Sequence, residues 1–196
     1  DREGFPILNY AATSDCINIV QDILVQINAI DDLKARKKIM CARAPKTGIV
    51  NLGMTGHFTA LISAMANSRP EVVSLLLRHG ADPFETENTG NDPLMFAAML
   101  GRTDNVKFWL DKFPDWDLER KPFYGSVVLG CAVLMGPQRL ELVKLLLDRG
   151  SLIDYRTDSG SSVLLHLCRC EDGDSTLLQL LLDHTKTKQR TREINY

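Results

Sequence analysis

A leucine-rich segment recurs along this chain, and each copy follows a segment rich in small residues. The leucine-rich copies begin at Glu71, Glu141 and Thr176. Each carries apolar residues around most of a helical circumference, so neighbouring elements must cover it on both broad sides. The segments rich in small residues begin at Thr59, Asp92, Val127 and Ser162. The intervals between these four positions are 33, 35 and 35 residues. A period of this length predicts stacked helix pairs that bury their apolar faces only against one another.

The unit resembles the ankyrin repeat, in which a loop precedes Thr-Pro-Leu-His at the start of an inner helix. An outer helix then follows Gly-His and ends at Gly-Ala-Asp. The copy that starts at Thr59 ends with Gly80-Ala81-Asp82 and fits without a gap. The leucine of the motif is present five times, as Leu8, Leu61, Leu94, Leu129 and Leu164. The resemblance implies an all-α ankyrin-repeat solenoid of stacked helix-turn-helix units with projecting loops. We expect its core to include these leucines together with Val72, Val73, Leu76, Val106, Trp109, Val143 and Leu146.

The register of the motif divides the chain into five repeats, an insertion and a tail. The repeats are approximately 1–30, 54–86, 87–121, 122–156 and 157–185, the insertion is 31–53, and the tail is 186–196. The family's histidine is absent from all five copies. Because that histidine ties the loop by hydrogen bonds, we expect these repeats to be less rigid than usual. The last leucine-rich helix is apolar all round, and we expect residues 185–196 or an adjoining chain to cover Leu177 and Leu181.

The insertion between the first two repeats carries a basic cluster. Two acidic residues, Asp31 and Asp32, are outnumbered there by six basic ones, which are Lys34, Arg36, Lys37, Lys38, Arg43 and Lys46. Insertions in ankyrin proteins usually emerge from the loop between repeats, so we expect a projecting finger that the fold could dispense with. Residues 30–44 are compatible with a short amphipathic helix, a hairpin or a solvated loop. A contact with a phosphate, a lipid or an acidic partner is the functional alternative.

The resemblance also implies a binding face. In ankyrin proteins the variable contact positions lie in the loop before Thr-Pro-Leu-His and at the end of the inner helix. Carried onto this sequence, the apolar members of the set are Phe58, Met99, Leu100, Phe123, Tyr124, Leu134 and Met135. More polar positions lie on either side of them, and an apolar centre inside a polar rim is typical of a protein interface. We expect these residues to hold a peptide or helix of a partner, with Phe123 and Tyr124 as anchors.

The sequence contains no Gly-x-x-x-x-Gly-Lys-Ser/Thr, Gly-x-Gly-x-x-Gly, His-Glu-x-x-His, Cys-x-x-Cys or Gly-x-Ser-x-Gly motif. The best metal candidate is the set His166, Cys168 and Cys170, but residues two apart on a helix point in nearly opposite directions. That geometry favours Cys168 as a small buried residue. Asp115 and Asp117 flank Trp116 in an altered Gly-Ala-Asp turn, with no second acidic pair. We therefore expect no catalytic residue, metal, cofactor or small-molecule substrate.

The cysteine count and the hydropathy pattern indicate the cellular compartment. The five cysteines are odd in number and three lie in apolar runs, so a disulfide framework is disfavoured. We expect an intracellular protein, cytoplasmic or nuclear, with no membrane span and no visible signal peptide. The sequence thus predicts a protein-interaction module or scaffold subunit that binds a partner on its concave face of loops and inner helices. The alternative is a contact between the basic insertion and an anionic surface, either a phosphoinositide membrane or RNA.

Overall fold

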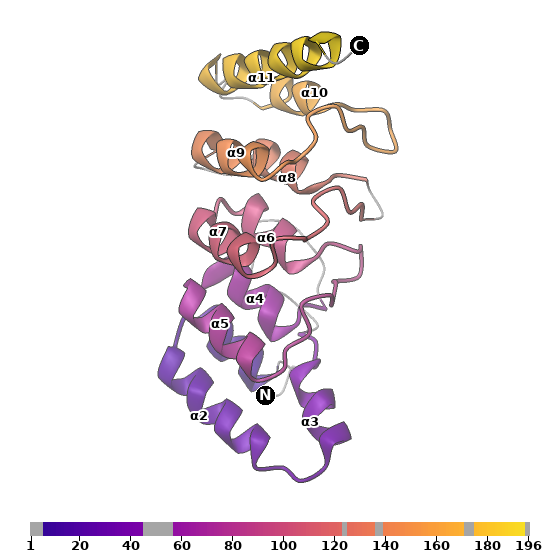
Figure 1. The fold of residues 1–196 in the computed structure, drawn as a ribbon. Helices are drawn as coiled ribbons and strands as arrows, with labels where there is room; N and C mark the ends of the chain where they lie inside the picture. The colour runs from indigo at the N-terminus through magenta and orange to yellow at the C-terminus, as the bar shows by residue number, and fades with distance from the viewer. Residues whose placement is uncertain (1–5, 45–56, 123–124, 136–138, 171–174, 195–196) are drawn as a thin grey trace.

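Helix pairs stack along one axis in the computed structural model, from the indigo N-terminal end to the yellow C-terminal end (Figure 1). The structure describes residues 6–44, 57–122, 125–135, 139–170 and 175–194. The inner helices are α1 (Ile7–Thr13), α4 (Ala60–Asn67), α6 (Pro93–Met99), α8 (Val128–Met135) and α10 (Val163–Cys168). The outer helices are α2 (Ile17–Asn28), α5 (Pro70–Arg78), α7 (Thr103–Lys112), α9 (Arg139–Asp148) and α11 (Ser175–Ile194). An additional helix, α3 (Leu33–Met40), lies in the insertion. The predicted all-α solenoid is confirmed.

Three of the inner helices begin at a capping side chain that stands at the threonine position of the repeat motif. The side-chain oxygens of Thr59, Asp92 and Ser162 each accept a hydrogen bond from the backbone N–H three residues later. Such a cap satisfies one of the amides that a helix start leaves unpaired. The repeated polar residue therefore sets where these inner helices begin.

The core runs the length of the stack as two rows of helices. Each inner helix from α4 to α8 packs between its neighbours in the row and against its own outer helix. Four of the motif leucines are buried, namely Leu8, Leu61, Leu94 and Leu129, and the predicted valines, Leu76, Trp109 and Leu146 are buried with them. Leu164, in the last inner helix, is only half-buried. The repeat register therefore located most of the core correctly.

The described part of the basic insertion, residues 31–44, does not project as a free finger. Its residues 33–40 form α3, whose last residue, Met40, is buried. The chain that follows forms a backbone bridge, in which Ala44 donates to Phe58 at 2.9 Å and accepts from His57 at 2.7 Å. Arg43 then donates to the carbonyl of Thr86 at 2.5 Å and pairs with Glu85. The finger interpretation is wrong for these residues, because a buried apolar residue and hydrogen bonds to distant residues attach them to the repeats.

The last outer helix also differs from the expectation. Leu177 and Leu181 are fully buried in the main core, where α11 packs against α9 and α10. They therefore need no cover from residues 185–196, and that expectation is wrong. The helix continues to Ile194, so the predicted boundary at residue 185 falls inside it. The leucines that remain exposed are Leu178 and Leu182, on another side of the same helix.

Candidate protein-interaction site

Two of the loops that precede an inner helix share one hydrogen-bonded backbone conformation. The N–H of Glu87 donates to the carbonyl of Asn91 at 3.1 Å, and Gly90 donates back to Glu87 at 3.1 Å. In the last repeat, Thr157 donates to Ser161 at 3.0 Å and Gly160 donates back to Thr157 at 2.9 Å. The two loops are therefore closed in the same way although they differ in sequence.

A buried polar side chain closes each of these loops from the inside. The carboxylate of Glu87, only 5% exposed, accepts hydrogen bonds from the backbone of Thr89 at 2.9 Å and of Asn91 at 3.0 Å. At the equivalent position the hydroxyl of Thr157 accepts from the backbone of Ser161 at 3.0 Å. Each of these side chains ties its own loop together through hydrogen bonds from the loop backbone. The tips of the loops, Asn88 with Asp158 and Ser159, stay exposed.

The structure removes two residues from the predicted binding face. Phe58 is 2% exposed and packs edge-on against Phe96, with ring centroids 4.8 Å apart. Met99 is buried as well, because it lies in α6 between α4 and α8. Both belong to the core and cannot contact a partner. Leu100 and Leu134 are half-buried at the ends of their inner helices.

The structure does not describe the side chains of the remaining three residues of that face. Phe123 and Tyr124 are among the residues it does not describe, and the same holds for the side chain of Met135. Their role as partner contacts stays a prediction.

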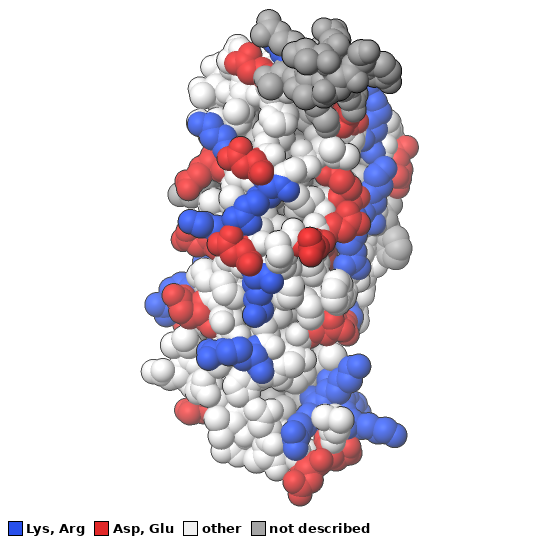
Figure 2. Space-filling view, in the orientation of Figure 1, with Lys and Arg blue, Asp and Glu red and all other residues white. Residues whose placement is uncertain are grey.

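Some side chains of the predicted basic contact are exposed, and others are bonded to groups of the protein itself. Lys34, Lys37 and Lys38 are exposed on α3, and Figure 2 shows basic side chains gathered over that helix beside acidic ones. Arg36 instead donates to the carbonyl of Ile30, and Arg43 pairs with Glu85. Lys46 lies outside the described residues. Three of the six predicted cations are therefore available to a ligand within the described region.

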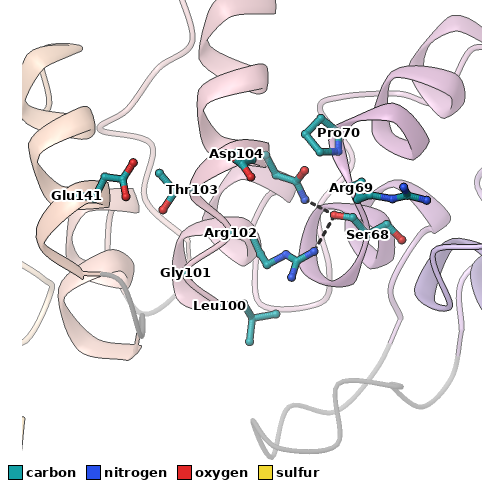
Figure 3. A pocket seen from close by; sticks show the side chains of 10 residues that line it. Ser68, Arg69, Pro70, Leu100, Gly101, Arg102, Thr103, Asp104 and Glu141 are labelled. Carbon is teal, nitrogen blue, oxygen red and sulfur yellow. Dashed lines mark hydrogen bonds between the residues drawn. The ribbon is translucent and has the colours of Figure 1, made fainter.

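A cavity of about 360 Å³ lies where the inner helices turn into the outer helices (Figure 3). There Arg102 donates to the carbonyls of Asn67 and Ser68, each at 3.0 Å. The amide of Asn105 donates to the carbonyl of the same Ser68 at 2.8 Å, and a dashed line in Figure 3 marks the bond from Arg102 to Ser68. Arg69 pairs with Asp15 of the first repeat at 2.7 Å. Because these polar groups join successive repeats, we interpret the cavity as a structural junction.

The structure contains an aromatic groove of about 400 Å³ that the sequence analysis did not predict. Phe84 follows α5, whereas Phe113 and Trp116 follow α7, and all three line the groove with Pro114. The rings of Phe84 and Trp116 stack with centroids 5.2 Å apart and planes 12° apart. Phe84 is 64% exposed even so. Beneath them the fully buried Trp109 meets Trp116 edge-on at 5.0 Å. A stacked aromatic pair that remains open to solvent is a common feature of protein-binding surfaces.

Three exposed carboxylates and one exposed lysine lie at this groove. Asp115 and Asp117 line it, Asp82 accepts a hydrogen bond from the N–H of Phe84, and all three are exposed. Lys112 also lines it and lies 5.9 Å from the centre of the Phe113 ring. Arg120 also lines the groove, but it is half-buried and stabilises the charge of the buried Asp92. Burial nevertheless raises the pKa of Asp92, and the Met95 amide, Arg120 and Trp116 oppose that shift.

The buried titratable groups of the last two repeats form a packed polar cluster. The hydroxyl of Tyr155 lies 3.3 Å from Nδ1 of His166. It occupies the space beside Gly130, where any Cβ would overlap it. Burial raises the pKa of Cys131 to about 12, so its thiol stays protonated. These groups therefore offer no activated nucleophile.

The sulfur and imidazole set considered as a metal site is dispersed. His166 is buried, whereas Cys168 is exposed, so the expectation that Cys168 is buried is wrong. Cys170 turns its sulfur to the carbonyl of Val133 at 3.5 Å. Among the described residues, no three His, Cys, Asp or Glu side chains gather as metal ligands would. No helix in the same part of the chain is long and apolar enough to cross a bilayer.

Comparison with known proteins places these features in a family. The family model for ankyrin repeats matches residues 8–121 in three copies. The ankyrin repeat and KH domain-containing protein mask of Drosophila melanogaster is 36% identical over 110 residues, which are 56% of this chain and 3% of that protein. The B-cell lymphoma 3 protein homolog of Mus musculus is 33% identical over 129 residues, 64% of this chain and 28% of that protein.

A third relative carries the name of an enzyme. The 2-5A-dependent ribonuclease of Homo sapiens is 46% identical over 46 residues, which are 24% of this chain and 6% of that protein. In all three relatives the matched segment is at most 28% of the protein's length. The likeness therefore concerns the repeats and does not extend to the rest of those proteins.

Proposed function

Because this chain belongs to the ankyrin-repeat family, whose repeats mediate protein–protein interaction, we propose that it holds a partner protein on its loop edge. The partner lies across the loop tips and the exposed ends of the inner helices, where Leu100 and Leu134 are half-buried. Phe123, Tyr124 and Met135 extend this contact in the fourth repeat. The chain acts as a scaffold subunit in this proposal and catalyses no reaction.

The observation that carries the proposal is the closure of the loops. Glu87 and Thr157 give two loops of different sequence the same backbone conformation. Their exposed tips then differ in chemistry, with Asn88 in one and Asp158 and Ser159 in the other. A preformed loop loses little conformational entropy when a partner binds, so binding energy goes to the contact itself.

The chemistry of the described residues gives an enzyme little support. The buried Cys131 stays protonated, and the exposed carboxylates of the groove lack a paired acid or base. We further propose an intracellular setting, which the five free cysteines support.

A second candidate function uses α3. Lys34, Lys37 and Lys38 are exposed on one short helix, so they could meet an anionic surface such as a phosphoinositide membrane or RNA. Attachment of α3 through Met40 and Arg43 would hold these lysines in place. Binding through them should weaken steeply as salt is added.

Affinity purification with chemical cross-linking tests the first proposal. We expect cross-links from the partner at loop residues 85–92 and 156–162. Cross-links confined to the outer helices would contradict the loop-edge proposal. Cross-links confined to α3, together with loss of capture at high salt, would favour the second candidate.

A further inference from the structure

We propose that the aromatic groove between the second and third repeats binds a basic segment of a partner protein that carries one large apolar side chain. The proposal rests on the interaction function proposed above and names the chemistry of the partner. It concerns the groove lined by Phe84, Phe113 and Trp116, which lies outside the loop tips of the predicted face.

The apolar part of the argument comes from how the groove is built. Phe84 is held by the turn before it, where its N–H donates to the side chain of Asp82 at 2.9 Å. On the other side Trp116 packs against Trp109 at 5.0 Å and against Phe113 at 5.6 Å between ring centroids. The groove is therefore preformed, and an apolar side chain that enters it buries surface at little entropic cost. Aromatic residues in such positions contribute much of the binding energy at protein interfaces.

The charged part of the argument identifies the partner's other side chains. Asp115 and Asp117 line the groove, Asp82 accepts a hydrogen bond from the N–H of Phe84, and all three carboxylates are exposed. The cations that line the groove are Lys112, which is exposed, and Arg120, which is half-buried and acts on Asp92. Glu85 is already paired with Arg43. The exposed surface therefore has a local excess of negative charge, which attracts lysine or arginine and repels an acidic segment.

Other occupants fit the same surface less well. An anionic membrane or a nucleic acid would be repelled by the three carboxylates. A second copy of this chain could offer the basic helix α3, where Leu33 is 73% exposed beside three exposed lysines. That arrangement would require self-association, which the experiment below measures.

The test uses the tryptophans of the protein as reporters. The chain has two, and Trp109 is fully buried whereas Trp116 is half-buried, so a ligand in the groove changes mainly the emission of Trp116. The probe is the synthetic peptide Gly-Lys-Lys-Leu-Phe-Lys-Lys-Gly. Two control peptides replace its lysines by glutamate or its Leu-Phe pair by alanine. We expect saturable binding of the first peptide and at least about tenfold weaker binding of both controls.

Variants of the protein separate the apolar contribution from the charged one. Phe84→Ala should weaken binding about tenfold or more, because it removes one wall of the groove. The triple variant Asp82→Asn, Asp115→Asn and Asp117→Asn should weaken binding and flatten its dependence on salt. An asparagine oxygen can still accept the hydrogen bonds that Asp82 and Asp117 receive within their turns. The matched control changes three exposed carboxylates elsewhere, Asp22, Asp104 and Asp148, to asparagine and should bind as the parent does.

Equal binding of the basic and acidic peptides would overturn the proposal, as would a Phe84→Ala variant that binds unchanged. Sedimentation at the same concentrations tests the second copy. A dimer that both Phe84→Ala and Lys34→Glu abolish would show that the groove holds α3 of another molecule, and the proposal would then be wrong. Partner cross-links on the loop tips without peptide binding in the groove would leave the proposed function standing and remove only this inference.

Discussion

The turns that follow the outer helices α7 and α9 serve the same purpose but are built differently. After α9, Gly150 takes a positive φ of 96°, and Ser151 enters the core, where it is 3% exposed. The turn after α5 is similar, with Gly80 at a φ of 89° and Ala81 buried. After α7 no glycine is present, the chain passes through Phe113 and Pro114, and Trp116 stands where the other turns have Ala81 and Ser151.

This difference shows which features the fold needs. All three turns connect an outer helix to the next loop, but two of them do so with glycine and a small residue. A tryptophan is too large for the buried position, and Trp116 accordingly stays half-exposed and stacks on Phe84. The aromatic surface therefore exceeds what the turn requires, which is the reason to assign it a role in binding.

The largest expected effect separates the buried base of the aromatic cluster from its exposed rim. Trp109→Ala should lower the free energy of unfolding by about 3–5 kcal/mol, because it leaves a large cavity at a fully buried position. Phe84→Ala is the control and should cost less than about 1 kcal/mol, since Phe84 is mostly exposed. Urea unfolding followed by circular dichroism measures both values. A Phe84 variant as unstable as the Trp109 variant would show that the rim is structural.

The glycine in the turn after α9 should matter next. Gly150→Ala should cost about 1–2 kcal/mol, because an alanine at this positive φ brings its Cβ close to the backbone. Open space surrounds the added methyl group, so backbone strain alone causes the loss. Thermal unfolding of this variant and of Gly80→Ala should give similar shifts. If neither variant is destabilised, the glycine turns are not constrained as described.

Ser151→Ala should stabilise the protein by roughly 1 kcal/mol. The hydroxyl of Ser151 is buried without a hydrogen-bond partner, and alanine already occupies the equivalent position as Ala81. Removing the hydroxyl removes the cost of burying it. Urea unfolding measures the gain, and a loss of stability would show that the hydroxyl has a partner such as a bound water.

The smallest expected effect is a pH dependence of stability that comes from His166 in the fifth repeat. Burial and the nearby charge of Arg169 lower the pKa of His166 below its ordinary value of 6.5. The unfolded chain therefore takes up a proton before the folded chain does, and stability falls as pH drops below 6.5. Between pH 7.5 and pH 5.5 the parent should lose more stability than His166→Gln. Equal losses would contradict this role for His166.

The repeat pattern predicted the architecture because it repeats the requirement for burial at every period. Leu76 and Trp109 occupy equivalent positions of their outer helices, and both are fully buried as expected. Phe58 was misassigned because a loop position was assumed to be exposed, whereas Asn9 and Ala44 bond to its carbonyl and Phe96 covers its ring. These partners are distant in sequence, and a single repeat motif contains no information about them.

The insertion and the groove show a second reason why the sequence could not predict every feature of the structure. The basic residues of the insertion indicated a solvated element, but the attachment depends on Met40 and on an ion pair between Arg43 and Glu85. The groove depends on Phe84 and Trp116, which lie in the turns of different repeats. In the sequence, Trp116 stands at a position where the equivalent turns have a small residue, and this difference was the one available signal. The stacking partner becomes visible only when the repeats are superposed in space.

Hydrogen–deuterium exchange of the chain with and without its captured partner tests the central claim most directly. The account predicts that the partner slows exchange in residues 79–92 and 112–121, which contain the aromatic groove and one closed loop. Helices α5 and α7 should exchange slowly in both states, because their apolar faces are buried. Protection confined to the outer helices, with both turns and the loop at residues 156–162 unchanged, would contradict the claim that the loop edge holds the partner.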